Sequence, residues 1–166
     1  MLRTRLNMPL EKFLSALFFL LITMTAFAAD QTEYITAKVI SITDGDTFRI
    51  LSNNRRIYVK LVGIDAPYKD QDFGMQAKQA LGNLVFNKEV RIQVVSWTGI
   101  SHLRANVYLD NMDISAEMVR RGFAWVVRDN EHVNTELMKL ETEARNFRRG
   151  LWGGSHPVPP WLWRKQ

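Results

Sequence analysis

The sequence predicts an α+β fold in which five short strands form a β-barrel and about three helices accompany it. Segments that alternate apolar and polar residues and are rich in β-branched residues dominate the stretch before Gly74. Apolar residues then recur at helical spacing after Gly74 and again near the C-terminus. At 166 residues and 46% hydrophobic residues, the chain has the size and composition of one globular domain.

The N-terminus has the pattern of a secretory signal peptide. Three basic residues precede the uncharged run Phe13–Ala28, which ends with the small residues Ala26 and Ala28. We therefore expect a signal peptide at residues 1–28, a short linker at residues 29–34, and a periplasmic or secreted protein. An uncleaved membrane anchor is the alternative, whereas cleavage would leave no stable membrane association.

Composition limits the chemistry that this chain can use. Removing residues 1–28 takes three of 22 basic and one of 17 acidic residues, which leaves 19 against 16. This mildly basic balance suits a polyanion such as DNA or RNA. The absence of cysteine excludes disulfides and thiolate nucleophiles, and the three histidines lack zinc-ligand spacing. A monomer is the default expectation.

Alternation, β-branched residues and turn residues define the strands. We expect strands at residues 35–42, 47–51, 56–64, 89–97 and 104–109. The first three form a meander, because the turn sequence TDGDT and the pair Asn53-Asn54 connect them. Asp110-Asn111 turns the chain after the fifth strand.

Three helices follow from apolar spacing and from capping residues. The expected helices run from Gly74 to about Asn87, from Ile114 to Gly122, and from the N-cap Asn134 to Gly150. The apolar face of the last helix consists of Leu137, Leu140, Ala144 and Phe147. The tail after Gly150 is interpreted as an extended segment that packs three tryptophans over the domain. A small barrel with these helices fits the oligonucleotide/oligosaccharide-binding (OB) type.

Carboxylates converge at one end of the predicted meander. Asp44 and Asp46 lie in the DGDT turn before the second strand, and Asp65 follows the third strand. The end of strand three returns near the start of strand two, so Asp46 and Asp65 can lie together. Two carboxylates suit a hard cation such as Ca²⁺ or Mg²⁺. Alone, DGDT is a weak signal, because Asp-Gly is common in hairpin turns.

Six motifs together resemble the staphylococcal nuclease-like (thermonuclease) family. They are VISITDGDTFRI, YVKLVGIDAP, FGMQAKQAL, EMVRRGFAWV, EARNFRRGLW and PVPPWLWRK, and they occur in the family's order and spacing. The resemblance covers residues 35–165 and implies a domain at residues 35–166. The fold that it implies is the family's five-stranded OB barrel with three helices.

The resemblance also implies a site. Active members of the family use a calcium ion, two arginines and a glutamate that activates the attacking water. Asp46 and Asp65 match the metal carboxylates, and the backbone carbonyl of Ala66 is a further ligand. Arg104 matches one arginine, whereas Lys60 stands at the position of the other. Lysine keeps the charge but lacks the planar fork that grips a phosphate.

Tyr68 occupies the position of the family's glutamate, directly after Asp-Ala-Pro. A phenol ionises only near pH 10, so it donates a proton where a base must accept one. General-base catalysis is typically worth about 10²–10⁴ in rate. Asp70 or Asp72 could serve as a substitute base, although a shifted backbone rarely restores the required geometry.

Three hypotheses follow for function. The first is a protein of nuclease ancestry with reduced or no hydrolysis, which binds nucleic acid or another anionic ligand. The second is an active calcium-dependent endonuclease with a relocated base, and the third is a protein-interaction scaffold. The aromatic residues Tyr58, Phe73 and Trp97 either stack on bases or fill the barrel, and filling the barrel is the favoured expectation.

Overall fold

The computed structural model describes residues 32–128 and 134–163, and the domain forms one unit from Thr32 onward. The predicted signal peptide at residues 1–28 lies outside the described residues, as does the first half of the predicted linker. No helix in the described ranges is both long and apolar enough to cross a membrane.

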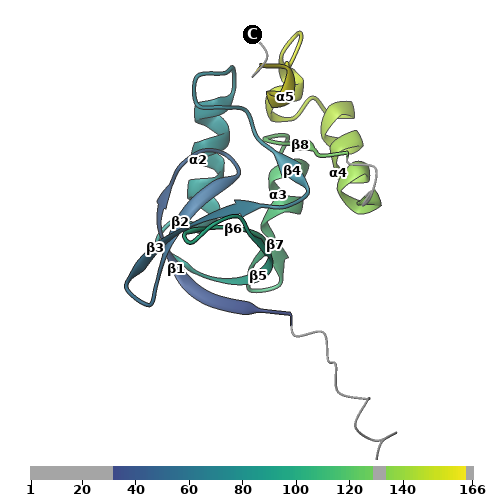
Figure 1. Ribbon diagram of the computed structural model, residues 1–166. Helices are drawn as coiled ribbons and strands as arrows, with labels where there is room; N and C mark the ends of the chain where they lie inside the picture. The colour runs from purple at the N-terminus through teal and green to yellow at the C-terminus, as the bar shows by residue number, and fades with distance from the viewer. Residues whose placement is uncertain (1–31, 129–133, 164–166) are drawn as a thin grey trace, which may run out of the picture. The chain divides into compact units, whose positions relative to one another are not determined.

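Five strands form the barrel that the sequence predicts (Figure 1). They are β1 (Tyr34–Ile42), β2 (Thr47–Ser52), β3 (Arg55–Leu61), β5 (Glu89–Trp97) and β6 (His102–Leu109). The hydrogen-bonded order is β3-β2-β1-β5-β6, with the short β7 (Met112–Asp113) beside β6. A parallel pairing between β3 and β6 closes the sheet into a barrel. The positive φ angles of Asn53 and Asn54 confirm the predicted turn between β2 and β3.

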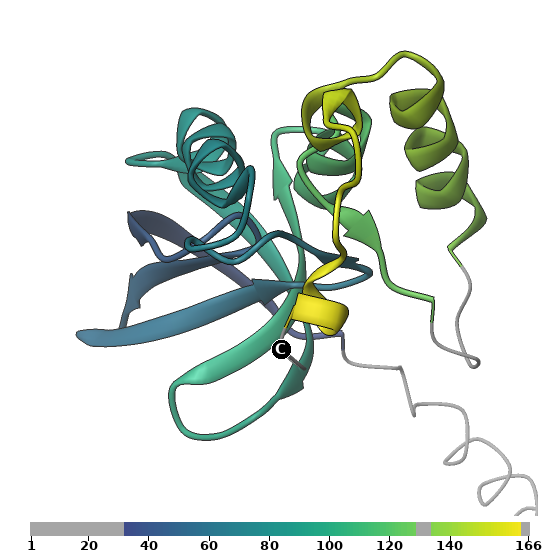
Figure 2. The same ribbon diagram turned by 90° about the horizontal axis from the view of Figure 1, so that it is seen from above.

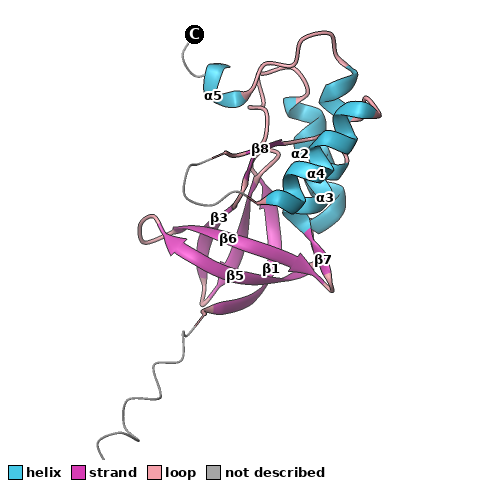
Figure 3. Ribbon diagram, turned by 90° about the vertical axis from the view of Figure 1, so that its right-hand side faces the viewer, coloured by secondary structure: helices cyan, strands magenta, loops and turns pink. Residues whose placement is uncertain are grey.

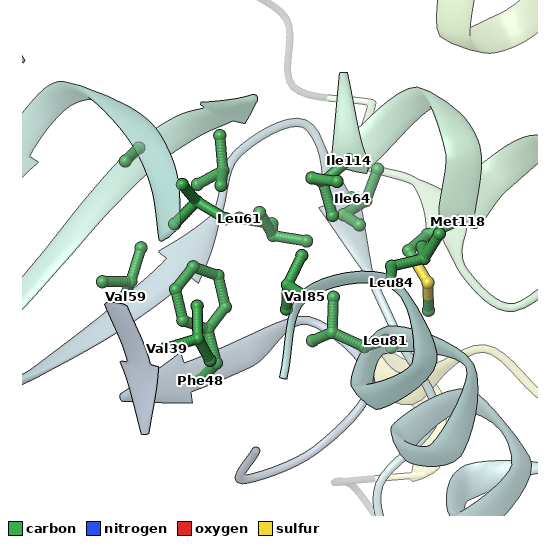
Figure 4. Packing of buried hydrophobic residues seen from close by; sticks show 14 of the residues in the cluster. Val39, Phe48, Val59, Leu61, Ile64, Leu81, Leu84, Val85, Ile114 and Met118 are labelled. Atoms are coloured by element: carbon green, nitrogen blue, oxygen red, sulfur yellow. The ribbon is translucent and has the colours of Figure 1, made fainter. Parts of the chain in front are cut away.

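The barrel interior is filled by the apolar residues of the alternating strands. Figure 4 shows Val39, Phe48 and Val59 grouped in this part of the core, and all three side chains are fully buried. The second part of the core lies where Leu81 and Leu84 approach Met118. Burying each large apolar side chain stabilises the fold by about 1.5–3 kcal/mol.

Three main helices gather on one side of the barrel (Figure 3). They are α2 (Gly74–Val85), α3 (Ile114–Arg120) and α4 (Thr135–Asn146), followed by a 3₁₀ turn (Gly150–Gly153) and the short α5 (Pro160–Trp163). Helix α3 packs against both α2 and α4 and lies between them (Figure 2). Asn134 caps α4 as predicted, since its Oδ1 accepts from the backbone N–H groups of Glu136 and Leu137 at 3.1 Å each.

The predicted third strand is wrong at its end. The chain leaves the barrel after Leu61, because Gly63 adopts a positive φ of 76°. Residues Ile64–Asp65 form a separate strand, β4, which pairs with β8 (Trp125–Val126) outside the main sheet. Asp65 is therefore held by β8 and not by the barrel.

The predicted apolar face of α4 is wrong at one position. Leu137 and Ala144 are buried, but the helix ends at Asn146 and the side chain of Phe147 is 69% exposed. The buried face instead includes Glu141, whose Oε1 accepts from the backbone N–H of Val126 at 3.1 Å.

The C-terminal tail contains helical turns where an extended segment is predicted. Its tryptophans nevertheless pack on the domain, around the buried Trp125. Trp152 and Trp161 meet Trp125 edge to face, with ring centroids 5.4 and 6.5 Å away. The tail thereby covers the short β4–β8 sheet that carries Asp65.

Gly45 sets the distance between the DGDT turn and the rest of the domain. A Cβ atom at this position would lie 2.6 Å from the Cβ of Ala77 and 2.7 Å from the Cβ of Ala66. Neither methyl group can move away, because both residues are buried. A glycine is therefore needed for the turn to pack between α2 and the segment that follows Asp65.

We predict that Gly45→Ala lowers the free energy of unfolding by about 1–3 kcal/mol, because the added methyl group overpacks this contact. Gly82→Ala is the matched control, since a Cβ there meets only Ile42 at 3.7 Å within the interior of α2. The free energy of unfolding of this control should rise by up to about 1 kcal/mol, because alanine has a higher helix propensity than glycine. Urea denaturation measures both values, and equal stability of the two variants would contradict the packing argument.

Candidate functional site

Strand register brings the predicted site residues together at one end of β3. Lys60 lies opposite Thr47 of β2 in the antiparallel ladder and beside Arg104 of β6 in the parallel ladder. Asp46 directly precedes Thr47, and its carbonyl accepts from the backbone N–H of Leu61 at 2.9 Å. The expected proximity of Asp46 to the end of strand three is thus present in the backbone itself.

The ammonium group of Lys60 bridges the two predicted metal carboxylates. Lys60 Nζ donates to Asp46 Oδ2 at 2.7 Å and to Asp65 Oδ1 at 3.2 Å. Asp46 is further fixed by the Thr47 hydroxyl, which donates to Oδ1 at 2.7 Å, and by the Ala66 N–H, which donates to Oδ2 at 2.9 Å. The carboxylate of Asp46 therefore accepts hydrogen bonds on both of its oxygens.

The surroundings shift the pKa values of Asp46 and Asp65 in opposite directions. Burial alone would raise the pKa of Asp46, but the Lys60 ammonium and the hydrogen bonds to the carboxylate hold it below its ordinary value. Burial raises the pKa of Asp65, with a contribution from the charge of Asp46, despite the more distant ammonium. Burial opposes the charge of Lys60, yet the two carboxylates raise its pKa. Lys60 therefore stays protonated at neutral pH.

Asp44 is a third carboxyl group at this end of the barrel, and the sequence did not single it out as a base. Burial and the neighbouring charge of Asp46 raise its pKa to about 6. Its Oδ1 accepts from the backbone N–H of Asp46 at 3.2 Å. A carboxyl group that ionises near neutral pH is chemically suited to accept a proton.

Arg104 is exposed on β6, next to Lys60. Within residues 32–128 and 134–163, no acidic side chain forms an ion pair with it. Arg104 is thus exposed beside Lys60, and its role as one of the family's two arginines stays a prediction from the resemblance.

Tyr68 lies beside a surface hollow between the barrel and α2, called here the Tyr68 hollow. Its lining includes Asp44, Arg49, Tyr58, Tyr68, Asp70 and Lys78. The backbone of Tyr68 is held in a turn by Gln71, whose N–H donates to the Tyr68 carbonyl at 2.9 Å. Asp70 shares the hollow, whereas Asp72 lines a different one together with Trp163. Of the two predicted substitute bases, Asp70 alone shares this hollow with Tyr68.

Three aromatic residues near the site lie outside the barrel, so the favoured expectation that they fill it is wrong for Tyr58, Phe73 and Trp97. Tyr58 stacks on His102 with ring centroids 4.6 Å apart, and the Arg49 guanidinium lies 5.4 Å from the Tyr58 ring. Trp97 is 42% exposed at the end of β5. Phe73 packs toward Gly154 of the tail.

Sequence reasoning missed two residues on the other side of Asp65. Arg128 and Trp161 line a second hollow together with Asp65. Arg128 is oriented by the buried Glu141, whose Oε2 accepts from it at 2.6 Å. The signal available was an arginine directly after the apolar segment WVV, but its proximity to Asp65 depends on the pairing of β4 with β8.

The donor set does not fit a calcium ion as it is arranged. Calcium takes 6–8 oxygen ligands, and here the ammonium of Lys60 lies against both predicted carboxylates. Among the described residues, no group of three or more acidic or histidine side chains has the arrangement of a metal site. The N–H of Ala66 donates to Asp46, and the predicted role of its carbonyl stays a prediction.

Comparisons with known proteins agree with the motifs. Residues 58–154 match the family described as "Staphylococcal nuclease homologue". The chain is 38% identical over 133 residues to an "Uncharacterized endonuclease" of Escherichia coli, covering 78% of this chain and 85% of that protein. It is 36% identical over 149 residues to an "Uncharacterized endonuclease" of Haemophilus influenzae, covering 89% and 83%. A "Micrococcal nuclease" of Shigella flexneri is 34% identical over 140 residues, covering 77% and 79%.

Proposed function

Because this chain belongs to the staphylococcal nuclease family, we propose that it is a nucleic-acid-binding member in which phosphodiester hydrolysis is strongly reduced. In this proposal the protein still binds nucleic acid, and the reduction lies in the cleavage of the phosphodiester bond. It rests on Tyr68 and Lys60, the two side chains that, by the resemblance, differ from the family's catalytic set.

The proposal is carried by Tyr68, the residue directly after Asp65-Ala66-Pro67, which the resemblance matches to the family's glutamate. A neutral phenol cannot accept a proton from water at neutral pH. Losing general-base help lowers a rate by about 10²–10⁴. The Gln71 N–H donates to the Tyr68 carbonyl, and the Tyr68 N–H donates to the Gln71 side-chain Oε1. These two bonds hold Tyr68 in its turn and disfavour a shift that would bring another residue to the same place.

Lys60 supports the same proposal. Its ammonium donates to Asp46 and Asp65, so it is engaged within the protein and is not directed at a phosphate. Arg104 remains exposed and can still bind a phosphate oxygen pair. An exposed Arg104 without the family's glutamate and second arginine favours binding of nucleic acid over its hydrolysis.

A second candidate function is an active endonuclease with a relocated base. Two observations favour it: relatives at 34–38% identity are named nucleases, and Asp70 and Asp44 line the Tyr68 hollow. The raised pKa of Asp44, about 6, is the value expected of a working base. The two candidates differ in whether the native chain cleaves.

We predict that Tyr68→Glu increases cleavage of single- and double-stranded DNA, since it restores a carboxylate at this position, by about 10-fold or more. Adding Lys60→Arg should increase cleavage further, because arginine supplies the missing planar fork. The assay compares purified native protein and variants with Ca²⁺ and with EDTA.

The control variants separate the two candidates. Brisk cleavage by the native protein, lost in Asp70→Asn or Asp44→Asn, would establish the relocated base and refute the proposal. Neither cleavage nor DNA binding by the native protein would instead select a protein-interaction scaffold.

We predict that Arg104→Ala weakens DNA binding at least about 5-fold, because an exposed guanidinium that binds phosphate contributes roughly 1 kcal/mol or more. Arg55→Ala is the matched control: it removes the same charge from the exposed opposite end of β3. Fluorescence anisotropy with a labelled oligonucleotide at fixed salt measures the DNA affinity of both variants. Equal losses of affinity would mean that DNA binding depends only on net charge and not on the position of Arg104.

We also propose that the domain is exported, which rests on the basic start and apolar run of residues 1–28. Cleavage after Ala28 predicts a mature protein that begins at Ala29. N-terminal sequencing of the protein recovered from the periplasm or medium tests this, and a sequence that starts at Met1 would contradict it.

A further inference from the structure

Two carboxylates are largely removed from water at the open end of β3. The side chain of Asp46 is 4% exposed and that of Asp65 is 11% exposed. Two like charges in such a setting repel each other and lose hydration, so their ionised forms require a nearby positive charge.

Lys60 provides this charge, and its position is fixed by the barrel. The residue is paired on both sides, with Thr47 of β2 and with Arg104 of β6. The backbone bond from Leu61 to the carbonyl of Asp46 holds the acid at the same level of the ladder. Strand register therefore places the ammonium of Lys60 against the two carboxylates.

The receiving carboxylate is equally fixed. The Thr47 hydroxyl and the Ala66 N–H orient Asp46, so that Oδ2 points to the ammonium at 2.7 Å. A lysine ammonium is a compact point charge with three donors, so it can donate to both carboxylates at once.

We propose that the Lys60 ammonium acts as a built-in cation between Asp46 and Asp65, so that a divalent cation binds this pair only by displacing it. The inference goes beyond the proposed function, because it concerns cation binding and does not depend on nucleic acid. Displacement has a route, since the Lys60 side chain is 43% exposed and can turn toward solvent. Its cost is the loss of both ion contacts and repulsion by the entering metal.

The test is calcium binding to the purified protein without nucleic acid, measured by isothermal titration calorimetry. Lys60→Met removes the ammonium and keeps most of the side-chain volume. We expect it to bind Ca²⁺ at least about 10-fold more tightly than the native protein, because one positive charge beside the site is gone. Lys88→Met is the matched control, an exposed lysine between α2 and β5, and should bind as the native protein does.

Two further measurements complete the test. Adding Asp46→Asn to Lys60→Met should abolish the gain in affinity. Without calcium, Lys60→Met should melt at a lower temperature than the native protein, and millimolar Ca²⁺ should restore much of the loss while leaving the native melting temperature unchanged.

Two outcomes would overturn the proposal. Equal calcium affinity of the native protein and Lys60→Met would mean that the ammonium does not compete for the site. A folded Lys60→Met that binds no calcium would mean that the carboxylate pair is not a cation site. Should Lys60→Met not fold, Lys60→Gln, which retains a hydrogen-bond donor without the charge, decides between these outcomes.

Discussion

The site depends on the pairing of β3 with two strands at once. Its antiparallel ladder with β2 sets Lys60 opposite Thr47, and its parallel ladder with β6 sets Lys60 beside Arg104 and closes the barrel. Val59 and Leu61 flank Lys60 and are buried in the core, so a slip of one residue would turn the ammonium inward. Core packing thus enforces the position of the charges outside the barrel.

Local pattern in the sequence was sufficient to predict most of this framework. Alternation located four of the five barrel strands within two residues at each end and overran the end of the third by three. Capping residues located the helices, and both signals depend on near neighbours in the chain. The errors involve distant partners. The break after Leu61 reflects pairing of β4 with β8, and the buried side of α4 includes Glu141 because Val126 presents its N–H there. Neither partner is visible in a local window.

The candidate site divides in the same way. The meander was enough to predict that Asp46 and the end of strand three lie together, since hairpin connections fix that neighbourhood. What lies between the carboxylates could not be predicted, because it depends on where a flexible lysine side chain ends. The positions of Asp44 in the Tyr68 hollow and of Arg128 beside Asp65 are likewise results of packing between segments.

Lys60 and Tyr68 both limit the negative charge at this end of the barrel: Lys60 adds a positive charge, and Tyr68 is neutral. The Lys60 ammonium is shared between Asp46 and Asp65, and burial together with the charge of Asp46 raises the pKa of Asp44 to about 6. A carboxylate at position 68 would face the same hollow as Asp44 and add to that repulsion, whereas a phenol adds none. The positive charge of Lys60 is already shared between Asp46 and Asp65, so a neutral side chain at position 68 avoids a further unbalanced carboxylate in this region.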